Sequence, residues 1–283
     1  MKYIKHVLTI LLLGVSMAGC NQDEAAIVPS ESLEVKYNVP QGEHEFDKKI
    51  TEFYNKYGTM ILYKYDPVDV IWNVNSVISS ASSPNKVVLP QEEDLELGVK
   101  TLFEIWLDLY PEDLLKKTLP RYIFMADSVF NYGTSLTYAT TTKTNITVGY
   151  LNKELTQMTA SKMKTFKANV NLMYFTYMFN GQKISIPEAF TAGVSYGTLT
   201  SANYREMGII HYSYSSLTPE KDIVESLKTL LTASQYTIDN LFKPATDKKG
   251  KIKERVAILV DEMIRLYGID LEALTGLTLP HVE

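Results

Sequence analysis

The side chains that could carry metal or nucleophilic chemistry are few in this sequence. It has one cysteine and four histidines, namely Cys20, His6, His44, His211 and His281. A catalytic zinc ion needs three protein ligands. His44-Glu45 begins like the zinc motif HExxH, but Lys48 stands where the second histidine belongs. We therefore expect His44 to be a solvated residue before a helix.

Two acids and one loop histidine form the other candidate set. Asp222 and Glu225 lie three residues apart at the start of a predicted helix, and His211 precedes them. Acids are common at helix starts for electrostatic reasons alone, and a lone histidine is usually a structural residue. The alternative is a working metal-dependent hydrolase, a peptidase, whose non-standard metal site is formed by these three residues.

Other catalytic sets and nucleic-acid binding find no support in the sequence. It lacks the G-x-S-x-G elbow, a glycine-rich phosphate loop and a nucleophilic cysteine. The basic residues are scattered along a chain of net charge -5, whereas a surface that follows phosphates needs them clustered. We expect no nucleic-acid partner.

The N-terminus has the layout of a bacterial lipoprotein signal. Lysines and an apolar run precede small residues and a cysteine in MKYIKHVLTILLLGVSMAGC. The apolar run is too short to span a membrane, which takes roughly 20 residues. We predict a signal peptide at 1–19, acylation of Cys20 that anchors the protein in outer-membrane lipid, and a tether at 20–42. Acids after Cys20 favour the outer face of that membrane, at the cell surface.

Periodicity predicts one domain over 43–283, of α+β class with helix in excess. An amphipathic helix ends at Gly58, and a strand follows in TMILYKYD. A second helix breaks at Pro111, and two or three short strands follow between 121 and 152. A long apolar helix over 153–180 is expected at the centre, and two more helices close the domain.

Several stretches in this order resemble a family of Bacteroidota lipoproteins, the substrate import-associated zinc metallohydrolases, which are related to zinc-binding metallopeptidases. The stretches are FDKKITEFYNKYGTMILYKYD, VGYLN, MGIIHYSYSSLTPEKDIVESL and KIKERVAILVDEMIRLYGIDLEAL. They cover most of the chain after the signal. The resemblance implies a mainly helical, zincin-like domain with a small β-sheet, whose central helix carries HExxH.

The matching stretch of this chain, FKANVNLMYFTYMFN, contains neither histidine nor glutamate. The motif would fall at 172–176 or at 174–178. An acidic segment of the family, EDFAE, is matched by KDIVE, in which Lys221 replaces the first acid. The resemblance thus implies a member without the zinc site.

We therefore expect a protein that is not an enzyme, without a cofactor, acting as a binding or accessory subunit of an outer-membrane nutrient-import system. Its partners would be a TonB-dependent transporter and a binding lipoprotein. The expected remnant of the cleft consists of Tyr174, Tyr177, His211, Asp222 and Glu225. A purely structural surface protein remains a third possibility.

Overall fold

The computed structural model describes residues 36–71, 85–131, 135–212 and 216–283. The chain divides into two units, Met1–Asn38 and Val39–Glu283, and the second holds every element below. The predicted signal peptide, Cys20 and the tether as far as residue 35 lie outside the described residues. Within the described ranges, no helix combines the length and apolar character needed to cross a membrane.

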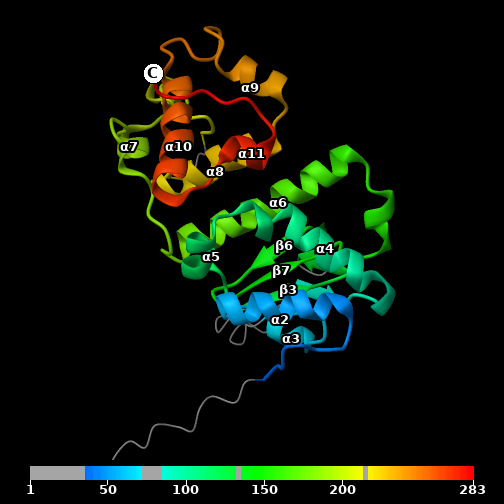
Figure 1. Cartoon of the computed structure of the whole chain (residues 1–283). Coiled ribbons are helices and arrows are strands. Elements are labelled where there is room, and N and C mark those ends of the chain that lie inside the picture. The colour runs from blue at the N-terminus through cyan, green and yellow to red at the C-terminus, as the bar shows by residue number, and fades with distance from the viewer. Residues whose placement is uncertain (1–35, 72–84, 132–134, 213–215) are drawn as a thin grey trace, which may run out of the picture. The chain divides into compact units, whose positions relative to one another are not determined.

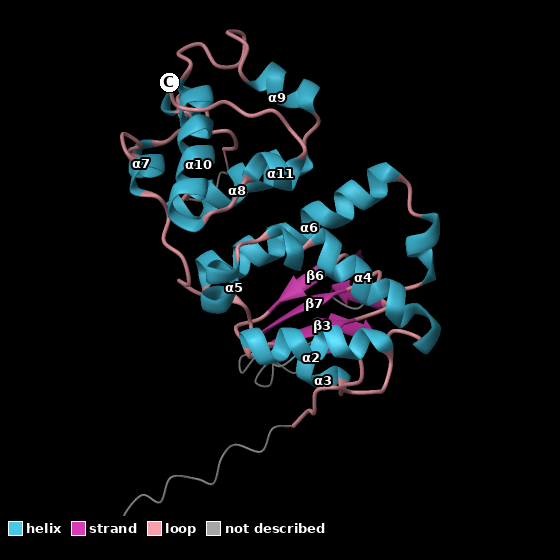
Figure 2. Cartoon of the chain, viewed as in Figure 1, coloured by secondary structure: helices cyan, strands magenta, loops and turns pink. Residues whose placement is uncertain are grey.

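The second unit is mainly helical (Figures 1 and 2). Its helices are α2 (Glu45–Tyr57), α3 (Pro67–Ile71), α4 (Leu95–Ile105), α5 (Glu112–Thr118), α6 (Ala160–Asn180), α7 (Glu188–Thr191), α8 (Pro219–Thr232), α9 (Gln235–Leu241), α10 (Lys251–Tyr267) and α11 (Leu271–Thr275). Its strands are β1 (Met60–Leu62), β2 (Asn85–Val88), β3 (Tyr122–Met125), β4 (Ser128–Asn131), β5 (Ser135–Thr137), β6 (Ala139–Thr141) and β7 (Asn145–Val148).

The strands form two small sheets. The first has the order β1-β3-β7-β6, in which β1, β3 and β7 are parallel and β6 is antiparallel to β7. Its inner strands, β3 and β7, are almost entirely buried, as parallel strands usually are. The second sheet is an antiparallel meander of β2, β4 and β5. The predicted α+β class is confirmed.

Local signals set the ends of the first helix and of the central one. Helix α2 stops at Gly58, whose φ of 70° suits glycine. Helix α6 starts at Thr159, whose hydroxyl accepts a hydrogen bond from the amide of Lys162. A short 3-10 segment, Lys153–Gln157, precedes it, so the expected helix over 153–180 is divided before Thr159.

Helix α6 is the centre of the domain. It packs along α8 and against β6 and β7, and most of its side chains from Phe166 onward are buried. The sequence places Val170, Met173, Tyr174 and Tyr177 on one apolar stripe at spacings of three and four, and the structure confirms it, since Val170, Tyr174 and Tyr177 are buried and Met173 is half-buried. At the end of α6 that approaches α8, Thr176 and Asn180 are among the few side chains that stay accessible.

Candidate functional site

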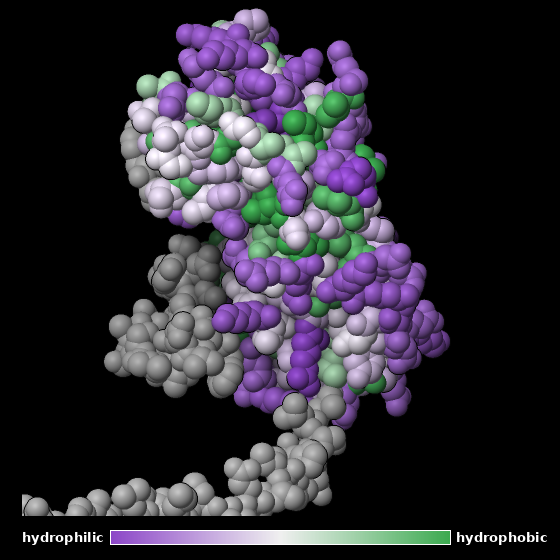
Figure 3. Space-filling model, turned by 90° about the vertical axis from the view of Figure 1, so that its left-hand side faces the viewer, coloured by the Kyte–Doolittle hydropathy of each residue, from purple (hydrophilic) through white to green (hydrophobic). Residues whose placement is uncertain are grey.

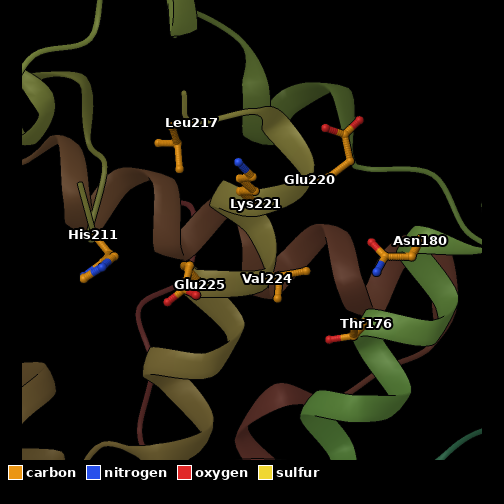
Figure 4. Close-up of a pocket in the computed structure, with 8 residues that line it drawn as sticks. All are labelled: Thr176, Asn180, His211, Leu217, Glu220, Lys221, Val224 and Glu225. Atoms are coloured by element: carbon orange, nitrogen blue, oxygen red, sulfur yellow. The ribbon is translucent and has the colours of Figure 1, made fainter. Parts of the chain in front are cut away.

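A pocket of about 480 Å³ lies where the last turn of α6 meets the first turns of α8 (Figure 4). Its size falls in the range of small-molecule sites. Helix α6, helix α8 and the loop before α8 all contribute, and the lining residues are Thr176, Asn180, His211, Leu217, Glu220, Lys221, Val224 and Glu225.

Helix α6 lines this pocket with two polar residues four positions apart. Thr176 and Asn180 share one helical face because 3.6 residues make a turn. The Thr176 hydroxyl donates to the carbonyl of Leu172 at 2.8 Å, which leaves its lone pairs available. The exposed Asn180 amide has no hydrogen-bond partner within the described ranges. The NH2 donor and the carbonyl acceptor of the Asn180 side chain are thus both open to a ligand.

Helix α8 supplies the charges of the pocket. It begins after Thr218, whose hydroxyl accepts a hydrogen bond from the amide of Lys221. The ammonium of Lys221 donates to the carbonyl of Ser216 at 3.2 Å. Glu225 pairs with Lys228 on the helix surface at 3.2 Å. Two carboxylates and one ammonium therefore border a pocket with apolar contacts at Leu217 and Val224.

Two of the five residues expected in the cleft, His211 and Glu225, line the pocket. Tyr174 and Tyr177 lie in the core instead, at 0% and 5% exposure. Burial raises the pKa of Tyr177 to about 12 and raises that of Tyr174 further, so both phenols stay protonated. Tyr174 packs edge-on against Trp106 and Tyr110, which is the role of a core aromatic.

Asp222, the fifth expected residue, is buried in an ion pair. Its carboxylate lies 2.6 Å from the guanidinium of Arg255 on α10 and accepts a hydrogen bond from the hydroxyl of Tyr196. Burial, and then the Asp222 charge, raise the pKa of Tyr196 well above its ordinary value. Asp222 thus links α8 to α10 and does not line the pocket.

The two registers considered for the motif, 172–176 and 174–178, match the pocket at one ligand position only, Thr176, which takes the place of the second histidine in the first register. Leu172, Tyr174 and Met178 are buried, and the pair that reaches the pocket is Thr176 and Asn180. Threonine and asparagine are not residue types that indicate a metal site or a nucleophile, and for that reason the sequence does not single out these two. Only their spacing of four residues, which puts them on one face of the helix, could have indicated the site.

The residues present do not fit a zinc ion. Among the described residues, no group of three or more His, Cys, Asp or Glu side chains is placed to hold a metal. His211 and Glu225 line the pocket, but Asp222, which would be the third ligand, is held by Arg255. A zinc site with three protein ligands cannot be built from this set.

The fold matches one solved structure over most of both chains. It is a crystal structure described as a "putative zinc-binding metallo-peptidase" from Bacteroides caccae. The sequences are 16% identical, the TM-score is 0.50, and the match covers 83% of this chain and 92% of the other. No protein-family model and no curated protein sequence matches the chain. At this identity the likeness concerns the fold.

This match corrects the prediction that the protein is not an enzyme, because the solved structure with the same fold is described as a peptidase. That prediction relied on the absence of HExxH from one helix. A fold can host different catalysts, so the loss of one motif does not exclude an activity. The chain has a fold like that of a metallopeptidase, with a polar pocket at the end of its central helix.

Proposed function

We propose that the protein is a lipid-anchored surface protein that binds peptides in the pocket between α6 and α8, as part of an outer-membrane nutrient-import system. Peptide binding is a step that a peptidase and a peptide-capturing subunit share. The observation that carries the proposal is the pair Thr176 and Asn180, four residues apart on α6, facing the charged residues of α8 across a pocket on a metallopeptidase-like fold.

The chemistry of the lining suits a peptide. The Asn180 amide can both donate to and accept from a peptide unit, and the Thr176 hydroxyl can accept from a peptide N–H. Lys221 can bind a carboxylate, whereas Glu220 and Glu225 can bind an ammonium group. Val224 and Leu217 offer apolar contact to a side chain. Figure 4 shows that these groups come from α6 and from the start of α8 with the residues just before it, and that His211 lies on a separate segment.

The binding test uses the full mature chain and a tryptic digest of casein, with retained peptides identified by mass spectrometry and their affinities measured by calorimetry. We expect Asn180→Ala and Thr176→Val each to weaken binding by about fivefold to tenfold, the usual effect of one lost hydrogen bond. Asn169→Ala is the matched control, since Asn169 lies three turns earlier on α6 and bonds to the carbonyl of Thr165. Equal effects at Asn169 and Asn180 would refute the site.

Peptide hydrolysis is a second candidate, favoured by the description of the matched structure. It would proceed without a three-ligand zinc site among the described residues. The assay follows cleavage of the retained peptides with and without added zinc, in the wild type and in His211→Ala and Glu225→Gln. Product formation that these two changes abolish would establish a hydrolase. Cleavage that survives both changes would point to a contaminating protease.

The surface anchor and the import system rest on the sequence. The signal-like start and Cys20 support lipidation, and the resemblance to import-associated lipoproteins supports the partner pair. Cys20→Ser should abolish labelling by a fatty-acid probe and release the protein from membranes, because buried acyl chains hold it there. Digestion by external protease in intact cells tests surface exposure. Co-purification with a transporter and a binding lipoprotein tests the partners; adjacent genes that encode neither would count against them.

A further inference from the structure

A second pocket, of about 380 Å³, lies between α5, the end of α10 and the loop after α6. It shares no lining residue with the first pocket. Two lysines, Lys117 and Lys183, line it together with Asp113, Leu114, Ile184 and Leu266. The residues of this pocket belong to three elements that are distant in sequence.

The backbone after α6 is shaped to bring Lys183 to this pocket. Gln182 has a φ of 52°, a left-handed conformation that is unfavourable for a residue other than glycine. The amide of Lys183 returns to the carbonyl of Met178 at 2.9 Å. The Lys183 ammonium then lies over the ring of Tyr177, 5.2 Å from its centre. The chain thus adopts a strained turn that holds Lys183 close to the end of α6.

The two lysines have no carboxylate partner within the described ranges. By contrast Lys116, the neighbour of Lys117 on α5, pairs with Glu112 at 2.6 Å. Asp113 also lines the pocket and has no partner there. With two cations and one anion, the lining carries a net charge of about +1, which a single carboxylate would neutralise.

Part of the pocket lining is apolar. Leu114 and Ile184 are buried, and Leu266 of α10 is 41% exposed. Figure 3 views the side of the molecule on which α5, α7 and α10 lie in Figure 1, and hydrophobic residues gather at mid-height on it, bordered by hydrophilic ones. Isolated exposed leucines are ordinary, but Leu266 borders a pocket that is also lined by two lysine side chains.

We propose that this second pocket binds a monocarboxylate with an aliphatic body, namely the C-terminal residue of a peptide that ends in a leucine-like side chain. The carboxylate lies between the ammonium groups of Lys117 and Lys183, and the aliphatic side chain packs on Leu114, Ile184 and Leu266. The ligand class rests on the proposed function of peptide binding; the carboxylate chemistry rests on the pocket alone.

The test titrates the full mature chain with acetyl-leucine, acetyl-Ala-Ala-Leu and their C-terminal amides, followed by NMR. We expect each acid to bind at least about tenfold more tightly than its amide, because charge-assisted hydrogen bonds are the strong ones. Lys117→Gln and Lys183→Gln should each weaken the acids about tenfold and leave the amides unchanged. Asp113→Asn should tighten them. Lys116→Gln, one residue away and directed to Glu112, is the matched control.

Equal affinity for acid and amide, or equal effects of Lys116→Gln and Lys117→Gln, would overturn the proposal. Octanoate is a further arm, and tighter binding of octanoate than of acetyl-Ala-Ala-Leu would overturn the peptide assignment in favour of a fatty acid. Asn180→Ala separates the two pockets. If it weakens casein peptides while acid and amide bind alike, the proposed function stands and this inference fails. If Asn180→Ala leaves the binding of casein peptides unchanged while Lys117→Gln and Lys183→Gln weaken the binding of the acids, the carboxylate site stands and the proposed function of the first pocket fails.

Discussion

The guanidinium of Arg255 lies 2.6 Å from the carboxylate of Asp222, and the two side chains are 7% and 1% exposed. The same guanidinium donates to the carbonyls of Phe190 and Gly208 and stacks over the ring of Phe190, 4.1 Å from its centre. One arginine therefore fastens α8, α10 and the segment that leads to His211. The pair of Asp222 and Arg255 thus holds α8, which lines the first pocket, although neither of the two residues lines that pocket.

Asp222→Ala should lower the free energy of unfolding by about 3–5 kcal/mol, because it leaves a buried arginine without its counter-charge. Urea unfolding at neutral pH measures the change. Glu225→Ala is the matched control on the same helix, where the ion pair with Lys228 is partly exposed, and its cost should stay within about 1 kcal/mol. Similar losses for both variants would mean that Asp222 has no special structural role.

Gly208 should be far less replaceable than Gly250, although both have a left-handed φ, of 76° and 68°. A Cβ on Gly208 would lie 2.6 Å from the Lys251 carbonyl and from Cδ of Arg255, whereas a Cβ on Gly250 meets nothing within 4 Å. Gly250→Ala should cost about 1 kcal/mol from the backbone conformation. Gly208→Ala adds a clash with backbone, for a total of about 3 kcal/mol or more. Thermal unfolding of the two variants decides this, and equal shifts would contradict the geometry.

Asn171 should be the most sensitive polar residue of α6. Its amide donates to the carbonyls of Ile105 and Lys167 and accepts from the hydroxyl of Tyr110, all at 2.7 or 2.8 Å, and it is fully buried. Asn171→Leu leaves these partners unsatisfied and should cost about 3 kcal/mol. Asn169→Leu, two residues earlier and half-buried, should change stability by about 0.5 kcal/mol. Chemical unfolding that ranks them in the other order would refute the network.

Much of the fold was predictable because its signals are local. The period of the apolar residues located α2, α8 and α10, and α2 ended at Gly58 as predicted. The short helices α7, α9 and α11 were missed, since four to seven residues are too few to show a helical period. The second sheet was missed because the pairing of β2 with β4 joins residues that are 40 to 46 positions apart in the sequence, from Val88 with Ser128 to Asn85 with Asn131.

The site was less predictable for a different physical reason. Histidines and acids stand out in a sequence by their metal and nucleophile chemistry, and two of those predicted, His211 and Glu225, line the pocket. Whether an acid faces a pocket or a buried arginine depends on partners distant in sequence, as Asp222 and Arg255 show. Thr176 and Asn180 are ordinary residue types, and only tertiary packing makes them the polar end of a buried helix.

The C-terminal tail should be held in a pH-dependent way by His281. Its imidazole contacts Asp261 at 2.5 Å and Glu272 at 3.3 Å, and hydrogen bonds to these two carboxylates raise the pKa of His281 above its ordinary 6.5. The folded pKa of His281 exceeds the unfolded one, so this stabilisation is complete below pH 6.5 and disappears as the pH rises through the folded value.

The contact between His281 and Asp261 also lowers the pKa of Asp261 below 3.8. That contribution to stability is present above pH 3.8 and is lost as the pH falls through the folded value. Melting temperatures of the wild type and of His281→Gln should therefore differ most between the ordinary pKa values of the two groups, 3.8 and 6.5, and converge once the pH exceeds the folded pKa of His281. His44→Gln, which removes an exposed pair with Glu92 on another part of the domain, is the control for a general effect of histidine loss. Parallel curves for the wild type and His281→Gln across this range would show that the tail is held by something else.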